Sequence, residues 1–320
     1  MKVSVIIPVY GVEKYIERCA RSLFEQTLKE IEFIFVNDCT CDNSIVILQA
    51  IIEEYPIRKS NVHIINHDHN MGLPLARQTG LRFAKGDYIA HCDSDDWVDK
   101  RMYELMYEEG EKKGADIIIC DYFRSDGINS TIHTEKHSEK NTDLVLNMMY
   151  ERESWAVWDK LVRKEIYDNP LFLFPKDSMG EDMVLSIQVA LYSKKIGSVN
   201  TPLYYYFVNS DSMSRQKSLS KRIRLFEEAC RNVEIVENRV LALNEKYYDD
   251  GIVYLKSLQR NLLLPVIKYT AVAEMWKKRF PKLGRKVIFS FHIPIRHKLR
   301  MIYTYFLICF YRNKNEDETC

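Results

Sequence analysis

The 320-residue sequence lacks the compositional biases that mark fibrous, disordered and low-complexity proteins. It contains only 11 Gly and 9 Pro, and its 46 basic residues nearly balance its 45 acidic residues. Hydrophobic residues make up 46% of the chain and charged residues 28%, which is an ordinary globular composition. Collagen-like and long disordered structures are therefore excluded, and the length suggests about two structural units.

Cysteine is also too sparse for a disulfide framework. The eight Cys residues are scattered, and several of them lie in apolar runs. The N-terminus leads directly into a strand-like segment without the charged and apolar regions of a secretory signal, so we expect reduced thiols and a cytoplasmic protein. Cys39 and Cys41 could form a zinc site with three histidines, but zinc sites usually contain two such Cys pairs, and we do not expect zinc here. The three are His63, His67 and His69.

Several familiar catalytic motifs are missing. The sequence has no G-x-x-x-x-G-K-[ST] phosphate loop, no G-x-G-x-x-G after the first strand, no H-E-x-x-H and no G-x-S-x-G. P-loop hydrolysis, dinucleotide redox chemistry, zincin proteolysis and α/β-hydrolase chemistry therefore lose their main support.

Strand and helix patterns alternate through the first 120 residues. Apolar runs of strand length alternate with segments of helical spacing, and the runs are 3–9, 31–36, 62–65, 88–92 and 117–120. This pattern predicts an α/β fold with a doubly wound, mostly parallel sheet. Ligands of such sheets bind at the carboxyl ends of the strands. The chemistry should therefore involve the residues that follow the strands, which are Pro8, Tyr10, Asp38, Asp93 and Asp95.

An acidic run, Asp93-Ser94-Asp95-Asp96, follows the fourth strand. Carboxylates this close repel one another unless a cation offsets them, and carboxylate oxygens favour Mg²⁺ or Mn²⁺ bound together with substrate phosphates. An alternative interpretation is an acidic N-terminus for the helix that starts near Lys100. Likewise, Asp38 alone would fit an Asx turn, and Arg77 alone would fit a solvated helix face.

Together, these residues make the sequence resemble glycosyltransferase family 2, the inverting nucleotide-sugar transferases of the GT-A fold. The resemblance covers about residues 1–215. Its motifs are VSVIIPVY (3–10), EFIFVND (32–38), DNS (42–44), NMGL (70–73), Ala76-Arg77, Gly80, GDYI (86–89), DSDDW (93–97), WDKL (158–161), GED (180–182), Tyr205-Tyr206, Ser212 and Ser214. The implied fold is a GT-A catalytic domain over 1–215, with a nucleotide-sugar-binding half (1–121) and an acceptor-binding half (122–215). A helical region (216–320), with breaks near Gly251 and Pro281, follows it.

The resemblance also implies roles for individual residues. The nucleotide-sugar would be bound by Pro8, Tyr10, Glu13, Asp38, Arg77, Asp93 and Ser94. Asp93 and Asp95 would bind Mn²⁺ or Mg²⁺, and Asp182 would be the general base, with Glu181 as the fallback. Trp158, Lys160 and Glu181 would lie on the acceptor side. One departure from the family pattern is Cys39, where Gly is usual; a positive φ there would strain the backbone.

The implied function is transfer of a sugar, from a UDP-sugar by family default, to a glycan or lipid-linked acceptor in cell-surface polysaccharide synthesis. A nucleotidyltransferase is one alternative, but it expects a Gly-rich basic loop where this chain has Tyr10-Gly11-Val12-Glu13. A catalytically degenerate membrane scaffold is the other alternative. The intact Asp95 and Asp182 argue against it.

The C-terminal part of the sequence is basic. Residues 275–315 contain eleven Lys or Arg and no Asp or Glu, interleaved with aromatic and aliphatic residues. The apolar run 301–311 is too short to span a bilayer, but a basic amphipathic segment fits the surface of an anionic membrane. We therefore expect a location at the inner face of the membrane and no nucleic-acid partner. Packing against the catalytic domain and an oligomer contact are the alternatives.

Overall fold

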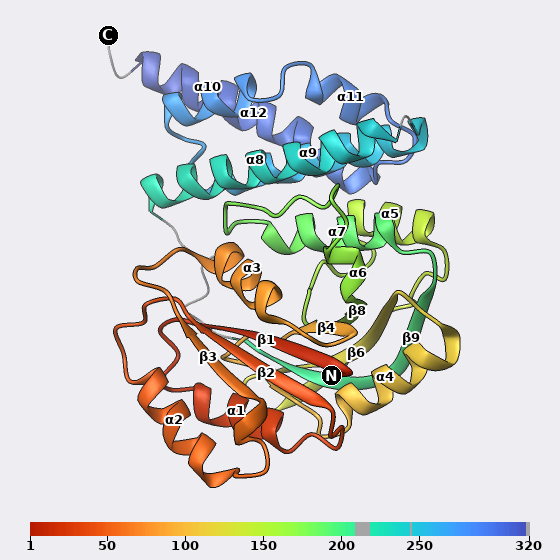
Figure 1. The fold of residues 1–320 in the computed structure, drawn as a ribbon. Helices are drawn as coiled ribbons and strands as arrows, with labels where there is room; N and C mark the ends of the chain where they lie inside the picture. The colour runs from red at the N-terminus through yellow and green to blue at the C-terminus, as the bar shows by residue number, and fades with distance from the viewer. Residues whose placement is uncertain (209–217, 244, 318–320) are drawn as a thin grey trace.

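The computed structural model describes residues 1–208, 218–243 and 245–317, and side chains as far as Tyr311. Within them, a nine-stranded sheet lies in the lower part of the molecule as drawn in Figure 1, with strand order β3-β2-β1-β4-β8-β6-β9-β5 and β7 paired to β6. The strands are β1 Val3–Val9, β2 Ile31–Asn37, β3 Val62–Asn66, β4 Tyr88–His91, β5 Trp97–Val98, β6 Ile117–Ser125, β7 Ser130–His133, β8 Lys160–Arg163 and β9 Ile196–Phe207.

The predicted α/β fold with a mostly parallel sheet is confirmed. Strands β1, β2, β3, β4, β6 and β9 run in one direction, whereas β5, β7 and β8 run in the other. One feature differs from the simple alternating pattern: β8 inserts between β4 and β6 and is antiparallel to both. The predicted strand at 117–120 is correct but extends to Ser125, where it forms a hairpin with β7.

Helices cover both faces of the sheet. One core cluster joins the sheet to α1, α2 and α4, and a second joins its other face to α3, α5, α6 and α7 (Figure 1). Each helix buries an apolar stripe because its hydrophobic residues recur at helical spacing. The bounds are α1 Ile16–Phe24, α2 Ser44–Glu54, α3 Leu73–Phe83, α4 Met102–Lys113, α5 Asn141–Met149, α6 Lys164–Tyr167 and α7 Glu181–Tyr192.

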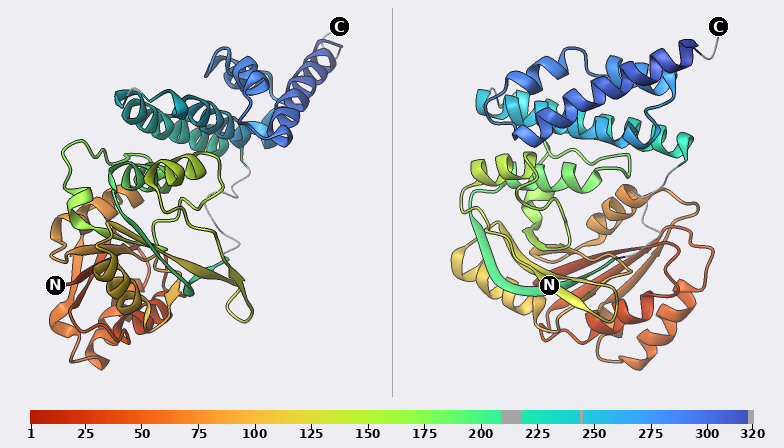
Figure 2. Two further views of the ribbon diagram at one scale, coloured as in Figure 1. Left: turned by 90° about the vertical axis from the view of Figure 1, so that its right-hand side faces the viewer. Right: turned by 180° about the vertical axis from the view of Figure 1, so that it is seen from behind.

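The C-terminal part is helical, as predicted, and stacks on α5 and α7 on the side away from the sheet (Figures 1 and 2). Its helices are α8 Leu219–Ala242, α9 Asp249–Arg260, α10 Thr270–Lys278, α11 Leu283–Phe289 and α12 Ile295–Asp317. The short 3₁₀ turns within the described ranges are Lys59–Asn61, Lys246–Tyr248 and Asn261–Val266. None of the described helices is long and apolar enough to cross a membrane.

One predicted helix break is misplaced. The break near Pro281 is found between α10 and α11, but Gly251 lies inside α9. The chain breaks before that helix, between α8 and α9. Gly251 is needed for packing instead, because a Cβ atom there would lie 2.5 Å from the Met149 sulfur.

The helical region shares its core with the sheet-bearing region. The second core cluster includes Val233, Val236 and Val240 of α8 together with the α7 residues that pack on the sheet. The buried Asn232 side chain also donates hydrogen bonds to the carbonyl oxygens of Asp177 and Met179, at 2.8 and 2.9 Å. The predicted boundary at 215/216, and the motif residues Ser212 and Ser214, lie outside the described residues.

Candidate active site

The strand register brings the predicted residues to one edge of the sheet. Val9 of β1 pairs with Asn37 of β2, and Ile6 of β1 pairs with His91 of β4, so the three strands end at the same side. Pro8 is buried within β1, whereas Tyr10 directly after it is exposed. This sheet edge has two parts, which we call the β1–β2 edge, with the loops after β1 and β2, and the α7 end, where the N-terminus of α7 meets the loop after β4.

Asp38 anchors the turn before α3. Its Oδ1 accepts hydrogen bonds from His67 Nδ1 (2.8 Å) and the Met71 amide (2.7 Å), and Oδ2 accepts one from the Gly72 amide (2.8 Å). Gly72 has φ +89°, a conformation that favours glycine. Because the donors lie about 30 residues away, the Asx-turn interpretation is wrong. The carboxylate instead fixes the NMGL motif beside the strand ends.

The loops after β1 and β2 hold each other. Glu13 is exposed and accepts hydrogen bonds from the Asn43 amide (3.1 Å), while Asp42 Oδ2 accepts one from the Glu13 amide (2.9 Å). Burial alone would raise the pKa of Asp42, but hydrogen bonds from Ser44, Thr40 and the backbone lower it to about 2. Cys39 has φ +56°, so the strain expected at this position is present.

Asp96 fastens the acidic run to β9. Its Oδ2 accepts a hydrogen bond from the Tyr204 hydroxyl (2.6 Å) and its Oδ1 one from the Phe207 amide (2.6 Å). The Asp93 amide in turn donates to the Tyr204 oxygen (3.1 Å). Burial, followed by the charges of Asp93 and Asp95, raises the pKa of Asp96 well above its ordinary value. The helix-start interpretation of the run is wrong because β5 lies between it and α4.

Sequence patterns do not indicate the contacts made by Tyr204, Asp96 and His67, because Asp96 enters only as part of the acidic run and His67 only as a possible zinc ligand. The partners of Asp96 lie more than 100 residues away, so no local spacing could have revealed the contact. The His67 ring bonds Asp38 through Nδ1 and the Thr79 hydroxyl through Nε2, at 2.8 and 2.9 Å. Among the described residues, no group of three or more His, Cys, Asp or Glu is arranged to hold a metal.

Arg77 connects the loop after β4 to the N-terminus of α7. Its Nη2 donates to Asp93 Oδ1 (2.8 Å) and its Nε donates to Glu181 Oε1 (3.0 Å). The side chain is buried, so the solvated-face interpretation is wrong. Burial lowers the pKa of Arg77, but Glu181 and Asp93 outweigh it and the pKa is raised. One guanidinium therefore holds the loop after β4 against the first residue of α7.

Two adjacent carboxyls begin α7. Gly180 precedes them with φ +81°, which lets the chain turn sharply into the helix. Glu181 is only 3% exposed, and burial raises its pKa to about 7 although Arg77 opposes the shift. Asp182 is partly exposed, and burial also raises its pKa. Its Oδ1 accepts a hydrogen bond from the Met183 amide (2.8 Å), and no donor within the described part of the chain reaches Oδ2.

The WDK motif covers the end of the loop before β8 and the first residue of that strand. The Trp158 ring stacks on Tyr204, with ring centroids 4.3 Å apart and an interplanar angle of 12°. Lys160 is buried, and its Nζ donates to the carbonyls of Ser154 and Ala156 and to Asp159 Oδ1, at 3.1, 2.6 and 2.7 Å. All three Nζ protons are thereby used, so Lys160 fixes the loop before β8.

The donor set in the loop after β4 fits a divalent cation. Asp93 and Asp95 supply carboxylate oxygens, and Ser94 between them is buried. Only one oxygen of Asp93 bonds Arg77. Mg²⁺ is typically held by one or two carboxylates plus substrate phosphates, and Asp93 and Asp95 carry that type of ligand atom.

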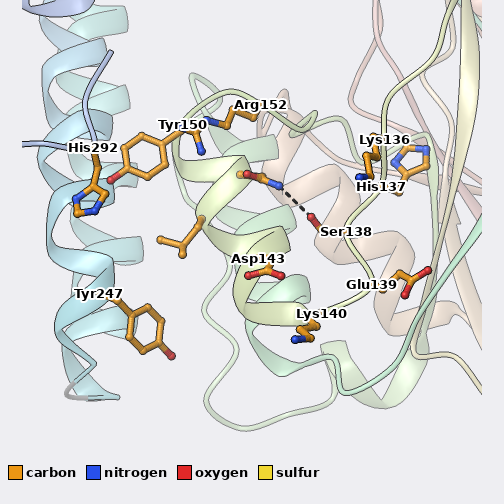
Figure 3. A pocket seen from close by; sticks show the side chains of 12 residues that line it. Lys136, His137, Ser138, Glu139, Lys140, Asp143, Tyr150, Arg152, Tyr247 and His292 are labelled. Carbon is orange, nitrogen blue, oxygen red and sulfur yellow. Dashed lines mark hydrogen bonds between the residues drawn. The ribbon is translucent and has the colours of Figure 1, made fainter. Parts of the chain in front are cut away.

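A cavity of about 800 Å³ lies between the loop before α5 and the helical region (Figure 3). Tyr150, Arg152 and Tyr247 bring aromatic and cationic groups to it, and His292 of the α11–α12 turn forms part of its wall. Ser138, in the same wall, donates a hydrogen bond to the buried Glu153. Aromatic rings beside a few polar and charged groups are typical of sites that bind a ligand with both apolar and polar surfaces.

Comparison with known proteins agrees with this geometry. The model of the family "Glycosyl transferase family 2" matches residues 4–183, more than half of the chain. The chain is 34% identical to an uncharacterized glycosyltransferase, EpsJ, of Bacillus subtilis; the alignment covers 66% of this chain and 62% of that relative. The chain thus spans less than two thirds of that relative's length.

Solved structures share the fold. The fold resembles S. aureus TarS 1–349 in complex with UDP, with a TM-score of 0.60, 18% identity and coverage of 97% of this chain and 89% of that one. It also resembles the mannosyltransferase PcManGT of Pyrobaculum calidifontis in complex with GDP-Man and Mn²⁺, with a TM-score of 0.56, 14% identity and coverage of 98% and 86%. From the family match and the shared fold, we conclude that the chain belongs to glycosyl transferase family 2.

Proposed function

We propose that this glycosyltransferase moves a sugar from a nucleotide-sugar donor to a hydroxyl of a glycan or lipid-linked acceptor with inversion at the anomeric carbon. The observation that carries the proposal is the Arg77 bridge, which holds Asp93 of the acidic loop and Glu181 of α7 on one guanidinium, with Asp182 next to Glu181 in the helix. A direct displacement needs these two parts together, because the leaving diphosphate and the attacking hydroxyl lie on opposite sides of one carbon.

Asp182 is the better candidate for the general base. Glu181 is buried and its Oε1 is committed to Arg77, whereas Asp182 is partly exposed and its Oδ2 is available. A carboxylate within hydrogen-bond reach of the acceptor hydroxyl can take its proton during attack. The pKa of Asp182 is raised, which makes it a stronger base than an ordinary aspartate. Glu181 then acts as a positioning residue through Arg77.

The donor would be bound along the β1–β2 edge. Pro8, Tyr10 and Glu13 would line the nucleotide pocket, and Asp38 would fix its wall through the Met71 and Gly72 amides. Asp93, Ser94 and Asp95 would lie at the diphosphate. Mn²⁺ or Mg²⁺ bound there would act as a Lewis acid for the leaving diphosphate. Arg77, which bonds Asp93, would bring its positive charge near the same phosphates.

The nucleotide of the donor and the metal are proposed from the ligands of similar structures, and the acceptor is proposed from the position of the cavity. A UDP-sugar is supported by the UDP in the similar TarS structure, and a Mn²⁺ requirement by the Mn²⁺ in PcManGT. The acceptor would extend past Trp158 and Lys160 toward the cavity lined by Tyr150 and Tyr247. We propose cell-surface polysaccharide synthesis at the cytoplasmic face of the membrane as the setting.

The test is a thermal-shift screen of the purified protein with UDP, GDP, dTDP and CMP, each with and without Mn²⁺. A ligand that binds only the folded state raises the melting temperature by mass action. We expect UDP to stabilise the protein, more so with Mn²⁺, and Asp95→Asn to abolish the effect of the metal. If no nucleotide raises the melting temperature, and Asp95→Asn behaves like wild type in this screen, the degenerate membrane scaffold would be favoured instead.

A further inference from the structure

The last two helices expose a large apolar surface. At the end of α11 and in the turn after it, Phe289 and Phe291 are 76% and 98% exposed. Along α12, exposed apolar side chains recur at helical spacing. Together these residues form what we call the aromatic face: Phe289, Phe291, Ile295, Leu299, Tyr303, Phe306 and Phe310. Contiguous exposed apolar patches of this kind mark interaction sites rather than ordinary surface.

The opposite side of α12 is firmly packed. Met301 and Ile308 are buried in the third core cluster with Trp276 of α10 and Val287 of α11. The buried His297 bonds the Ser257 hydroxyl of α9. The helix is therefore fixed in place with its aromatic face exposed. It belongs to the helical layer that lies on the side of the molecule away from the sheet (Figures 1 and 2). The tail thus packs through one face and exposes the other.

The charges around the aromatic face identify the kind of partner. The exposed Arg285, Lys286, Arg296 and Arg300 lie on the same two helices, and residues 275–315 contain no acidic side chain. In a symmetric dimer formed through this face, the same basic residues would meet their own copies and repel them. An anionic lipid surface accepts both the apolar side chains and the positive charges.

The location of the face also suits a lipid-linked acceptor. His292 lines the cavity between the sheet-bearing and helical regions, while its neighbour Phe291 is almost fully exposed (Figure 3). A membrane under Phe291 would therefore border the cavity proposed for the acceptor. This point rests on the proposed function, whereas the docking surface does not.

We propose that the aromatic face docks the protein on an anionic lipid bilayer. The apolar side chains enter the headgroup and acyl boundary, and the basic residues contact anionic headgroups. Removing residues after Ala273 would be a poor test, because Trp276, Leu283 and Val287 belong to the core. Point substitutions of exposed residues leave that core intact.

The experiment is flotation of the full-length protein with vesicles of phosphatidylcholine, with and without phosphatidylglycerol. We expect binding to the anionic vesicles, weakened by added salt. Phe291→Ser/Phe306→Ser should weaken binding by about tenfold for each substitution, and Arg296→Gln/Arg300→Gln by about fivefold for each charge removed. The matched controls are Ile128→Ser, at a 92% exposed residue of the β6–β7 hairpin, and Arg82→Gln/Lys112→Gln. Both should bind like wild type.

Three outcomes would overturn the proposal. The first is no flotation of wild type, the second is equal flotation of the aromatic-face and control variants, and the third is a dimer that is lost in Phe291→Ser/Phe306→Ser. The nucleotide thermal shift separates this proposal from the catalytic one. Phe291→Ser/Phe306→Ser should retain that shift, and a protein that floats but binds no nucleotide would contradict only the proposed function.

Discussion

The β1–β2 edge and the α7 end hold their carboxylates in opposite ways. At the β1–β2 edge, Asp42 is surrounded by donors, and despite the effect of burial its pKa falls to about 2. At the α7 end, burial raises the pKa of Glu181 to about 7, although Arg77, which Glu181 shares with Asp93, opposes the shift. A carboxylate saturated with donors shapes a loop, whereas one that is short of donors can exchange a proton.

The comparison assigns proton transfer to the α7 end, so the largest effect is expected at Asp182. Asp182→Asn keeps the shape but removes the base, and turnover should fall by about 10²- to 10⁴-fold. A sugar-transfer assay measures turnover, and the nucleotide-induced thermal shift measures donor binding. The thermal shift should persist in this variant. Asp168→Asn, at an exposed residue of the Asp168–Lys164 pair, is the control. Undiminished turnover of Asp182→Asn would show that Asp182 is not the general base.

The contrast between the β1–β2 edge and the α7 end also depends on Arg77, whose guanidinium is shared by Asp93 and Glu181. Arg77→Gln leaves the buried Glu181 and the partly exposed Asp93 without their shared cation, which should cost about 3–5 kcal/mol in unfolding free energy because Glu181 is left as an unpaired buried charge. The loss should shrink as the pH falls below about 7 and Glu181, whose pKa is raised by burial, becomes protonated. Denaturant unfolding of Arg77→Gln and of Arg82→Gln, an exposed residue on the same helix, measures it. Equal stability of the two variants would show that the bridge contributes little, and Arg77→Lys provides a milder variant if Arg77→Gln does not fold.

Stability as a function of pH sharpens the contrast at Glu181. The folded protein binds this proton more tightly than the unfolded chain does, since its pKa is raised from 4.5 to about 7. The contribution of Glu181 therefore favours folding at low pH and declines by roughly 2–3 kcal/mol as the pH rises between those values. Glu181→Gln lacks this titration, so it should gain stability relative to wild type over the same range. Glu165→Gln, at an exposed residue, should run parallel to wild type.

The smallest effect is expected at the β1–β2 edge, where strain rather than charge is at stake. Cys39→Gly relieves a residue with φ +56° and should raise the unfolding free energy by about 0.5–1 kcal/mol, after the added freedom of the unfolded chain is subtracted. Thermal unfolding measures the change. Cys41→Gly, which lacks a positive φ, should instead be destabilising. A loss of stability in both variants would show that the turn gains nothing from glycine.

Local patterns predicted β1, β2, β3, β4 and the first part of β6, the helices between these strands and their common edge. Strand–helix alternation places the ends of β1, β2 and β4 together, because parallel strands share an edge, and Pro8, Asp38 and Asp93 follow from that rule. The insertion of β8 could not be predicted, because a four-residue antiparallel strand carries no pattern of its own. The position of the break before α9 could not be predicted either. Gly251 suggested a break, but it lies inside α9, where glycine is needed because a Cβ atom would meet the Met149 sulfur.

The sequence by itself determined the fold class, the family and the residue types at the strand ends, because these depend on periodicity and short motifs. Only the tertiary structure decided how those residues share their partners. The Arg77–Glu181 contact joins residues 104 positions apart, and the Asp96–Tyr204 contact joins residues 108 positions apart. It also decided which side of α12 is covered, because the basic tail is apolar on both faces and only packing against α10 and α11 buries one of them. Burial then sets the pKa values, since desolvation depends on what surrounds a group in space rather than on its neighbours in sequence.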